Sequence, residues 1–124
     1  MQFPKSMNAA ILTEQNKPLV VDRVELPQDL EVGQVLVKIQ YSGICGSQLG
    51  EIDGAKGEDK YLPHLLGHEA SGVVQSVGVG VKHVKSGDHV VLHWRKSQGI
   101  ESAPPRYTWN GKSLNAGLIA TFNE

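Results

Sequence analysis

Apolar residues recur along this chain in short stretches that turn residues interrupt, and each stretch has the length of a β-strand. The clearest stretch is Gln34–Tyr41, in which apolar and polar side chains alternate. One face would carry Val35, Val37, Ile39 and Tyr41, and the other would carry Leu36, Lys38 and Gln40. Because successive side chains of a strand point to opposite faces, this pattern predicts a strand with one buried face.

Five further short runs of β-type residues, separated by turn residues, predict strands. They are Met7–Leu12, Leu19–Arg23, Gly72–Val77, His89–Trp94 and Leu118–Phe122. Residues 72–77 and 89–94 are apolar enough to be buried, and Asn16-Lys17-Pro18 and Gly78-Val79-Gly80 are typical turns. Short strands at this spacing, with no long amphipathic helix, favour an antiparallel barrel or sandwich over a βαβ protein.

Three other segments are expected to be less regular. A single helical turn can follow Cys45, with Ser47 as its cap. Residues Glu51–Lys60 are predicted to form a solvated loop, and Ser97–Asn115 a long polar loop. A loop as long as Ser97–Asn115 is often functional in a compact domain.

Length, charge and cysteine content exclude several classes of protein. The chain has 124 residues, enough for one domain, and 12 basic against 13 acidic residues give a net charge of −1. With no block of one sign, neither nucleic acid nor an anionic membrane is an expected partner. Cys45 is the only cysteine, so no intrachain disulfide can form. No apolar run has the length of a membrane span or a signal peptide, so the expected location is cytoplasmic.

Two glycine-rich segments carry candidate chemistry. Cys45 lies in Gly43-Ile-Cys-Gly-Ser47 after the strongest strand, and His68 precedes Glu69 in Gly67-His-Glu-Ala-Ser-Gly72. A thiolate and an imidazole are preferred zinc ligands. On residue types alone, however, a lone cysteine is more often a small buried hydrophobe, and a lone histidine is more often structural. The spacing between Cys45 and His68 matches no zinc-finger pattern.

The resemblance of three segments, in their order along the chain, to a known family favours the metal-ligand interpretation of Cys45 and His68. The stretch from Val35, VLVKIQYSGICGSQL, resembles the first zinc-ligand segment of the zinc-dependent alcohol dehydrogenases, in the medium-chain dehydrogenase/reductase superfamily. The stretch from Leu66, LGHEASGVVQSVG, is similar to the zinc signature of that family, and VKSGDHVV from Val84 resembles its next strand entry. The resemblance covers residues 7–95 well.

The resemblance implies a mainly β fold, a GroES-like β-barrel with short helical turns and a long irregular lobe. Residues 1–6 would be an N-terminal extension, and residues 7–124 the N-terminal catalytic domain, truncated at its C-terminal end. The nucleotide-binding Rossmann domain of the family is absent from this sequence, which has no GxGxxG motif. The exposed edge of the truncated sheet could support a homo-oligomer.

The resemblance also implies roles for individual residues. Cys45 and His68 match zinc ligands, Glu69 matches a carboxylate that can join the metal transiently, and Ser47 matches a hydroxyl that relays the substrate proton. Ser47 and Glu69 are thus the implied catalytic residues. In the family, zinc polarises an alcohol and a hydride goes to NAD or NADP. The third ligand and the NAD(P) site would lie outside this chain, so the isolated chain is expected to hold zinc poorly or not at all and to be inactive.

Several positions depart from the family pattern. Gln48 replaces an aspartate that supports the histidine ligand, and Gly50 replaces a histidine of the proton relay. The region His93–Asn115 has no cysteine, so no structural zinc is expected there, and Tyr107 and Trp109 are predicted to hold this lobe in a small apolar cluster of its own.

Some interpretations stay open. His93 and Trp94 could line a substrate cleft, although core packing is favoured. His64, His83 and His89 have no ligand spacing and are expected on the surface or in strands. A GroES-like binding or assembly module without catalysis is the alternative function. A zinc-free quinone-reductase-type relative is disfavoured because Cys45 and His68 occupy the zinc-branch positions.

Overall fold

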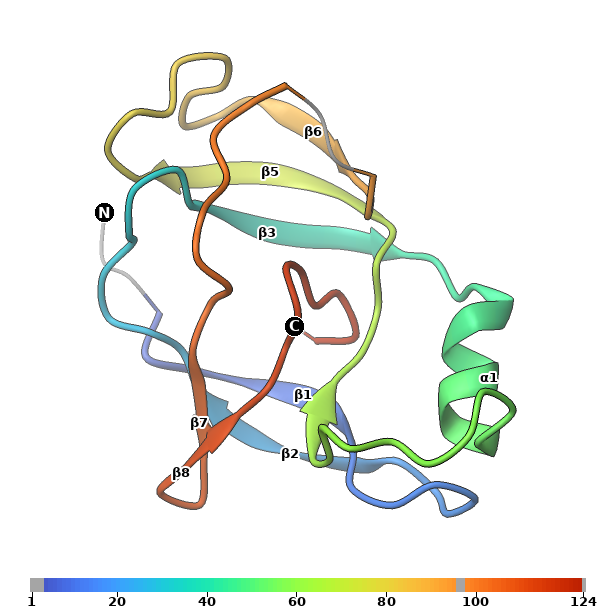
Figure 1. Cartoon of the computed structure of the whole chain (residues 1–124). Helices are drawn as coiled ribbons and strands as arrows, with labels where there is room; N and C mark the ends of the chain where they lie inside the picture. Colours follow the sequence, from blue (N-terminus) through green and yellow to red (C-terminus); the bar gives the residue numbers. More distant parts are fainter. Residues whose placement is uncertain (1–3, 96–97, 124) are drawn as a thin grey trace.

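The computed structural model describes residues 4–95 and 98–123, which form a nearly closed barrel of strands with one helix at its side (Figure 1). The elements are β1 (Ser6–Leu12), β2 (Val20–Glu25), β3 (Val35–Ser42), α1 (Gly46–Asp53), β4 (His64–Leu65), β5 (Ala70–Val77), β6 (His89–Leu92), β7 (Tyr107–Trp109) and β8 (Lys112–Leu114). The predicted mainly β fold is confirmed. No helix within the described residues is long and apolar enough to cross a membrane.

Two sheets build the barrel. One has five strands in the order β4-β1-β2-β7-β8, and the other has three in the order β3-β5-β6. The chain after β8 returns to β4, where Asn115 forms a parallel bridge with His64 and the backbone N–H of Leu65 donates to the Asn115 carbonyl at 2.8 Å. The five-stranded sheet therefore almost closes on itself.

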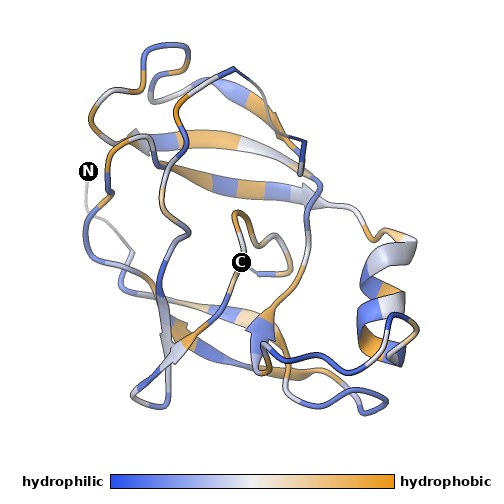
Figure 2. Cartoon of the chain, viewed as in Figure 1, coloured by the Kyte–Doolittle hydropathy of each residue, from blue (hydrophilic) through white to orange (hydrophobic). Residues whose placement is uncertain are grey.

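The main core lies against the five-stranded sheet. Met7, Ala9 and Ile11 are buried on the inner face of β1, at every second position of the strand. The rest of this cluster comprises Val24, Leu26, Leu65, Leu114 and Ala116. Figure 2 shows the apolar positions of these strands interrupted by hydrophilic ones, as expected when one face of each strand meets water.

The three-stranded sheet is built around β5. Its Gly72 pairs with Ile39 of β3 and Val90 of β6, and a Cβ atom at Gly72 would collide with the Lys38 carbonyl oxygen. Glycine is therefore required for the strands to approach this closely. Two irregularities in the β3–β5 register interrupt the predicted alternation, and Tyr41 is 77% exposed rather than buried.

The predicted buried strand His89–Trp94 is shorter and more exposed than expected. It ends at Leu92, and Val91 is 76% exposed. The reason is its position, because β6 lies at the edge of the three-stranded sheet and its outer face has no covering layer. An apolar run alone cannot distinguish such an edge strand from a central one.

The predicted long loop Ser97–Asn115 contains a β-hairpin, although Ser97 itself lies outside the described residues. β7 and β8 pair through a two-residue turn, Asn110-Gly111, with φ values of 52° and 76°. Both values are in the left-handed region that a type I′ turn requires. Tyr107 and Trp109 pack on the main core, so the expected separate cluster in this lobe does not form.

The predicted last strand, Leu118–Phe122, is an irregular segment that runs between the two sheets (Figure 1). The N–H groups of Thr121 and Phe122 donate to the Leu66 carbonyl, and the Phe122 carbonyl accepts from Ala10 of β1 at 2.9 Å. Thr121 is 1% exposed. Backbone groups of this segment are thus hydrogen-bonded without forming a regular strand.

Candidate functional site

The backbone places Cys45 and His68 side by side. Ser42 at the end of β3 pairs with Ala70 at the start of β5, and the N–H of Gly43 donates to the Glu69 carbonyl at 2.9 Å. Because the strands are antiparallel, the segment that leaves β3 and the segment that enters β5 meet at one edge of the sheet. The two residues singled out from the sequence thus become neighbours.

Gly43 and Glu69 are in direct contact at this edge of the sheet. A Cβ atom at Gly43 would lie 2.6 Å from Oε1 of Glu69, so the Glu69 side chain lies over the Gly43 backbone. Within the described residues, no group of three or more histidine, cysteine, aspartate or glutamate side chains is close enough to share a metal ion. In this structure Glu69 is therefore not grouped with Cys45 and His68.

Cys45 is the N-cap residue of α1 and has an extended backbone (φ −101°, ψ 154°) immediately before the first turn. The predicted single turn capped by Ser47 is instead a helix of eight residues, with Ser47 inside its first turn. The free N–H of Cys45 is satisfied by Oε1 of Gln48 at 2.8 Å. A glutamine three residues after the first capping position makes this reciprocal contact in many helices.

Gln48 connects the helix to His68. Its side chain is 3% exposed, and its Nε2 lies 3.1 Å from Nδ1 of His68 and 3.3 Å from Oγ of Ser47. Gln48, which replaces the aspartate of the family pattern, thus makes specific contacts of its own. It joins Cys45, Ser47 and His68 in one hydrogen-bonded cluster.

The thiol of Cys45 is set up to ionise. Hydrogen bonds from the side chain and then the backbone of Ser47, followed by one from the His68 side chain, lower the pKa of the Cys45 thiol from 9.0 to about 7. Each of these bonds favours the thiolate over the thiol. The thiolate is the form that binds metals and acts as a nucleophile.

Trp94 stands beside this cluster. Its ring centroid is 6.5 Å from that of His68, and the side chain is 65% exposed. The favoured expectation of core packing is therefore wrong for Trp94, because β6 ends two residues earlier and the chain leaves the sheet there. His93 is exposed and its Nδ1 accepts the N–H of Arg95 at 3.1 Å, so it also lies outside the core.

A second polar contact lies in the segment between α1 and β4. Oδ2 of Asp59 is 2.6 Å from Nε2 of His64, and both side chains are only 12% exposed. Burial opposes ionisation of Asp59, but the bonds from His64 and from the N–H of Tyr61 outweigh it and lower the pKa of this carboxyl. Glu51–Lys60 is therefore not a solvated loop throughout, since it begins in α1 and ends in this contact.

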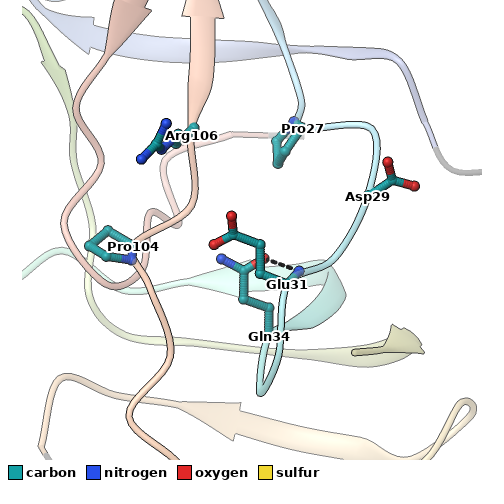
Figure 3. A pocket seen from close by; sticks show the side chains of 6 residues that line it. All are labelled: Pro27, Asp29, Glu31, Gln34, Pro104 and Arg106. Atoms are coloured by element: carbon teal, nitrogen blue, oxygen red, sulfur yellow. Dashed lines mark hydrogen bonds between the residues drawn. The ribbon is translucent and has the colours of Figure 1, made fainter. Parts of the chain in front are cut away.

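The surface hollows lie elsewhere. One of about 90 Å³ opens between the end of β2 and the segment before β7 (Figure 3). Its lining residues are Pro27, Asp29, Glu31, Gln34, Pro104 and Arg106. Both charge signs line it, and none of these residues belongs to the Cys45–His68 cluster. It is therefore no extension of that site.

The cluster fits part of a zinc centre. A thiolate and an imidazole at hydrogen-bonding distance are the right donor types, and zinc sites use three or four protein ligands. The described residues bring together two. Cys45 and His68 can thus serve as two corners of a tetrahedral site, and within the described residues no third side chain of this kind is grouped with them.

Comparison with known proteins identifies the family of this chain. The family model of the alcohol dehydrogenase GroES-like domain matches residues 31–121. Alcohol dehydrogenase-like 3 of Arabidopsis thaliana is 46% identical over 85 residues, which are 67% of this chain and 21% of that protein. An alcohol dehydrogenase of Geobacillus stearothermophilus is 37% identical over 120 residues, which cover 90% of this chain and 35% of the relative.

A solved structure supports the same assignment. Benzyl alcohol dehydrogenase from Acinetobacter calcoaceticus superposes with a TM-score of 0.62 at 29% identity, over 69% of this chain and 23% of that one. The chain thus spans between a fifth and about a third of the relatives described here. The match to the family model, residues 31–121, includes the segments that carry Cys45 and His68. The chain belongs to the family of the alcohol dehydrogenase GroES-like domain, the N-terminal domain of alcohol dehydrogenase-like enzymes.

Proposed function

We propose that this chain is the part of a zinc-dependent alcohol dehydrogenase that holds two ligands of the catalytic metal, Cys45 and His68. The observation that carries the proposal is their hydrogen-bonded pairing at one sheet edge, with the pKa of the Cys45 thiol lowered to about 7. A thiolate available near neutral pH and an adjacent imidazole suit zinc better than magnesium or calcium, which prefer oxygen ligands.

The other residues of the cluster have supporting roles in this proposal. The hydroxyl of Ser47 bonds to the Cys45 side chain and lies close to Gln48, where it can pass on the proton of a bound alcohol. Glu69 is next to His68 in the chain, and its carboxylate would join the metal transiently. A zinc ion held there would supply a Lewis acid for the substrate oxygen.

The remaining parts of the enzyme are proposed to lie outside this chain. They are the third metal ligand and the NAD or NADP site, because the curated relatives are three to five times longer than the matched segment. The substrate class is a small alcohol or aldehyde, and the location is the cytoplasm. Alone, the chain is expected to bind zinc weakly and to transfer no hydride, since two-ligand sites are weak.

Cobalt binding tests the proposal. A Co²⁺ ion bound through the Cys45 thiolate gives a sulfur-to-metal charge-transfer absorption, and Zn²⁺ at a similar concentration should displace it. We expect a weak but saturable signal for the unmodified chain and its loss in Cys45→Ser. His68→Asn should weaken binding about 10-fold or more, while His83→Asn, an exposed histidine elsewhere, should leave it unchanged.

The same titration can reject the proposal. Absence of the charge-transfer signal at millimolar Co²⁺, or equal binding by the unmodified chain and Cys45→Ser, would contradict it. That result would favour the alternative function, a GroES-like module that binds or assembles without catalysis.

A further inference from the structure

The buried amide of Gln48 has different partners at its two ends. Its Oε1 accepts a hydrogen bond from the backbone N–H of Cys45 at 2.8 Å, and its Nε2 faces Nδ1 of His68 at 3.1 Å. The side chain is 3% exposed, so water cannot readily substitute for either partner. The orientation of the amide therefore decides which hydrogen-bonding groups meet at His68.

The start of helix α1 fixes this orientation. A backbone N–H can only donate, so the amide atom that faces Cys45 N–H has to be the oxygen. The reversed amide would place an NH₂ group against that N–H and leave a buried donor unsatisfied. The amide nitrogen consequently faces His68.

The orientation of the amide sets the position of a proton on His68. An amide NH₂ group has no lone pair to offer, so Nδ1 of His68 has to be the acceptor. A neutral imidazole whose Nδ1 accepts carries its proton on Nε2. We propose that Gln48 is a positioning residue that holds the neutral ring of His68 in the tautomer with hydrogen on Nε2.

This tautomer matters for the proposed metal site, on which this step of the inference rests. A histidine ligand needs a lone pair on the nitrogen that binds the metal. In His68 the lone pair of Nδ1 points at Gln48, and Nε2 carries the hydrogen. His68 therefore has to move its proton, and Gln48 has to give up a hydrogen bond, before Nε2 can serve as a ligand.

A carboxylate at position 48 would reverse the arrangement. Glutamate has the same length as glutamine, and one of its oxygens can keep the bond from Cys45 N–H. The other oxygen can only accept, so it selects the tautomer with hydrogen on Nδ1 and leaves the lone pair of Nε2 free. Gln48→Glu thus changes the hydrogen-bonding sense at His68 with little change in shape.

The tautomer can be read directly by long-range ¹H–¹⁵N correlation NMR of the metal-free chain, at a pH where His68 is neutral. We expect Nε2–H in the unmodified chain and Nδ1–H in Gln48→Glu. Gln75→Glu is the matched control, because this half-buried glutamine of β5 donates only to its own strand, at the Val73 carbonyl. It adds the same charge and should leave His68 in the Nε2–H form.

Zinc titration of the same variants gives the second readout. We expect Gln48→Glu to bind Zn²⁺ about 10- to 100-fold more tightly than the unmodified chain, with no such gain in Gln75→Glu. If the tautomer changes as expected and neither protein binds zinc through Cys45, the proposed function fails while the role of Gln48 stands.

Other outcomes overturn the inference itself. A metal-free His68 with its proton on Nδ1 in the unmodified chain contradicts it, and so does an unchanged tautomer in Gln48→Glu. If that variant does not fold, the spectrum of the unmodified chain still decides.

Discussion

Cys45 shows how far a single residue can be interpreted before its surroundings are known. Its residue type alone favoured a small buried hydrophobe, and its neighbours in the sequence favoured a metal ligand. The structure makes it the N-cap residue of α1, hydrogen-bonded to Ser47 and His68. The bonds that lower the pKa of its thiol come from the side chain and backbone of Ser47 in the first turn of α1 and from His68, 23 positions away, and composition shows neither contact.

The environment of Trp94 could not be predicted from the sequence. The sequence offered two environments for it, a cleft or the core, and general aromatic burial favoured the core. Its exposure depends on where β6 ends and on the free edge of the three-stranded sheet. Those are properties of strand order, which short apolar runs do not specify.

Asp59 carries a prediction at the residue scale. Its carboxylate accepts bonds from His64 and from the N–H of Tyr61, and its folded pKa is lower than the ordinary value of about 3.9. A carboxyl whose pKa is depressed by folding stabilises the protein above its unfolded pKa, and this contribution is lost as the pH falls through the folded pKa. Asp59→Asn should therefore lower the free energy of unfolding by about 1 kcal/mol at pH 7 and by less below pH 4.

Urea unfolding of both proteins at several pH values measures this difference. Asp29→Asn removes an exposed carboxylate and serves as the control, with little effect expected at any of these pH values. A loss of stability in Asp59→Asn that stays constant down to pH 3 would show that the carboxylate charge is not the cause.

At the scale of elements, the longer strands were predicted well. β1, β2 and β3 begin and end within one or two residues of the expected bounds, because each is long enough to form a recognisable run between turn residues. β4, with two residues, and β7 and β8, with three each, are too short to show a period. Their pairing comes from contacts between distant parts of the chain.

The β7–β8 hairpin was nevertheless detectable. Asn-Gly between two short stretches is the strongest local signal for a two-residue turn, and here it occurs as Asn110-Gly111. The polar composition of residues 97–115 hid it, because loop and hairpin sequences share the same turn residues. A search for turn dipeptides, rather than for apolar alternation, would have found this element.

Gly111 gives the prediction for this element. Its φ of 76° is one that residues with a Cβ adopt only at a cost, so Gly111→Ala should reduce the free energy of unfolding by about 1–2 kcal/mol. Gly99 is the matched control, since its backbone lies outside the left-handed region and a Cβ there meets no atom within 4 Å. Equal effects of Gly111→Ala and Gly99→Ala in thermal or urea unfolding would contradict the assignment of the turn.

At the scale of the whole molecule, closure of the barrel was not visible in the sequence. It depends on Asn115 meeting β4 and on residues 118–123 running between the two sheets. These contacts join segments about 50 to 110 residues apart, and they satisfy backbone groups without any regular pattern. The resemblance to a known family supplied the barrel, whereas hydrophobic periodicity supplied only its separate strands.

The contact between Ser42 and Thr121 allows this closure to be measured. Oγ of Ser42, at the end of β3, lies 2.9 Å from Oγ1 of the buried Thr121, whose backbone is bonded to Leu66. Ser42→Ala leaves the Thr121 hydroxyl buried without this partner, which should cost about 1–3 kcal/mol. In a Thr121→Val background the same Ser42→Ala substitution should cost almost nothing, because the buried hydroxyl is gone.

A double-mutant cycle by urea unfolding tests this coupling, and a parallel cycle that combines Thr121→Val with the exposed Ser113→Ala should be additive. Additive effects of Ser42→Ala and Thr121→Val would mean that this contact does not hold the two sheets together, and that the segment after Gly117 is retained by its backbone bonds alone.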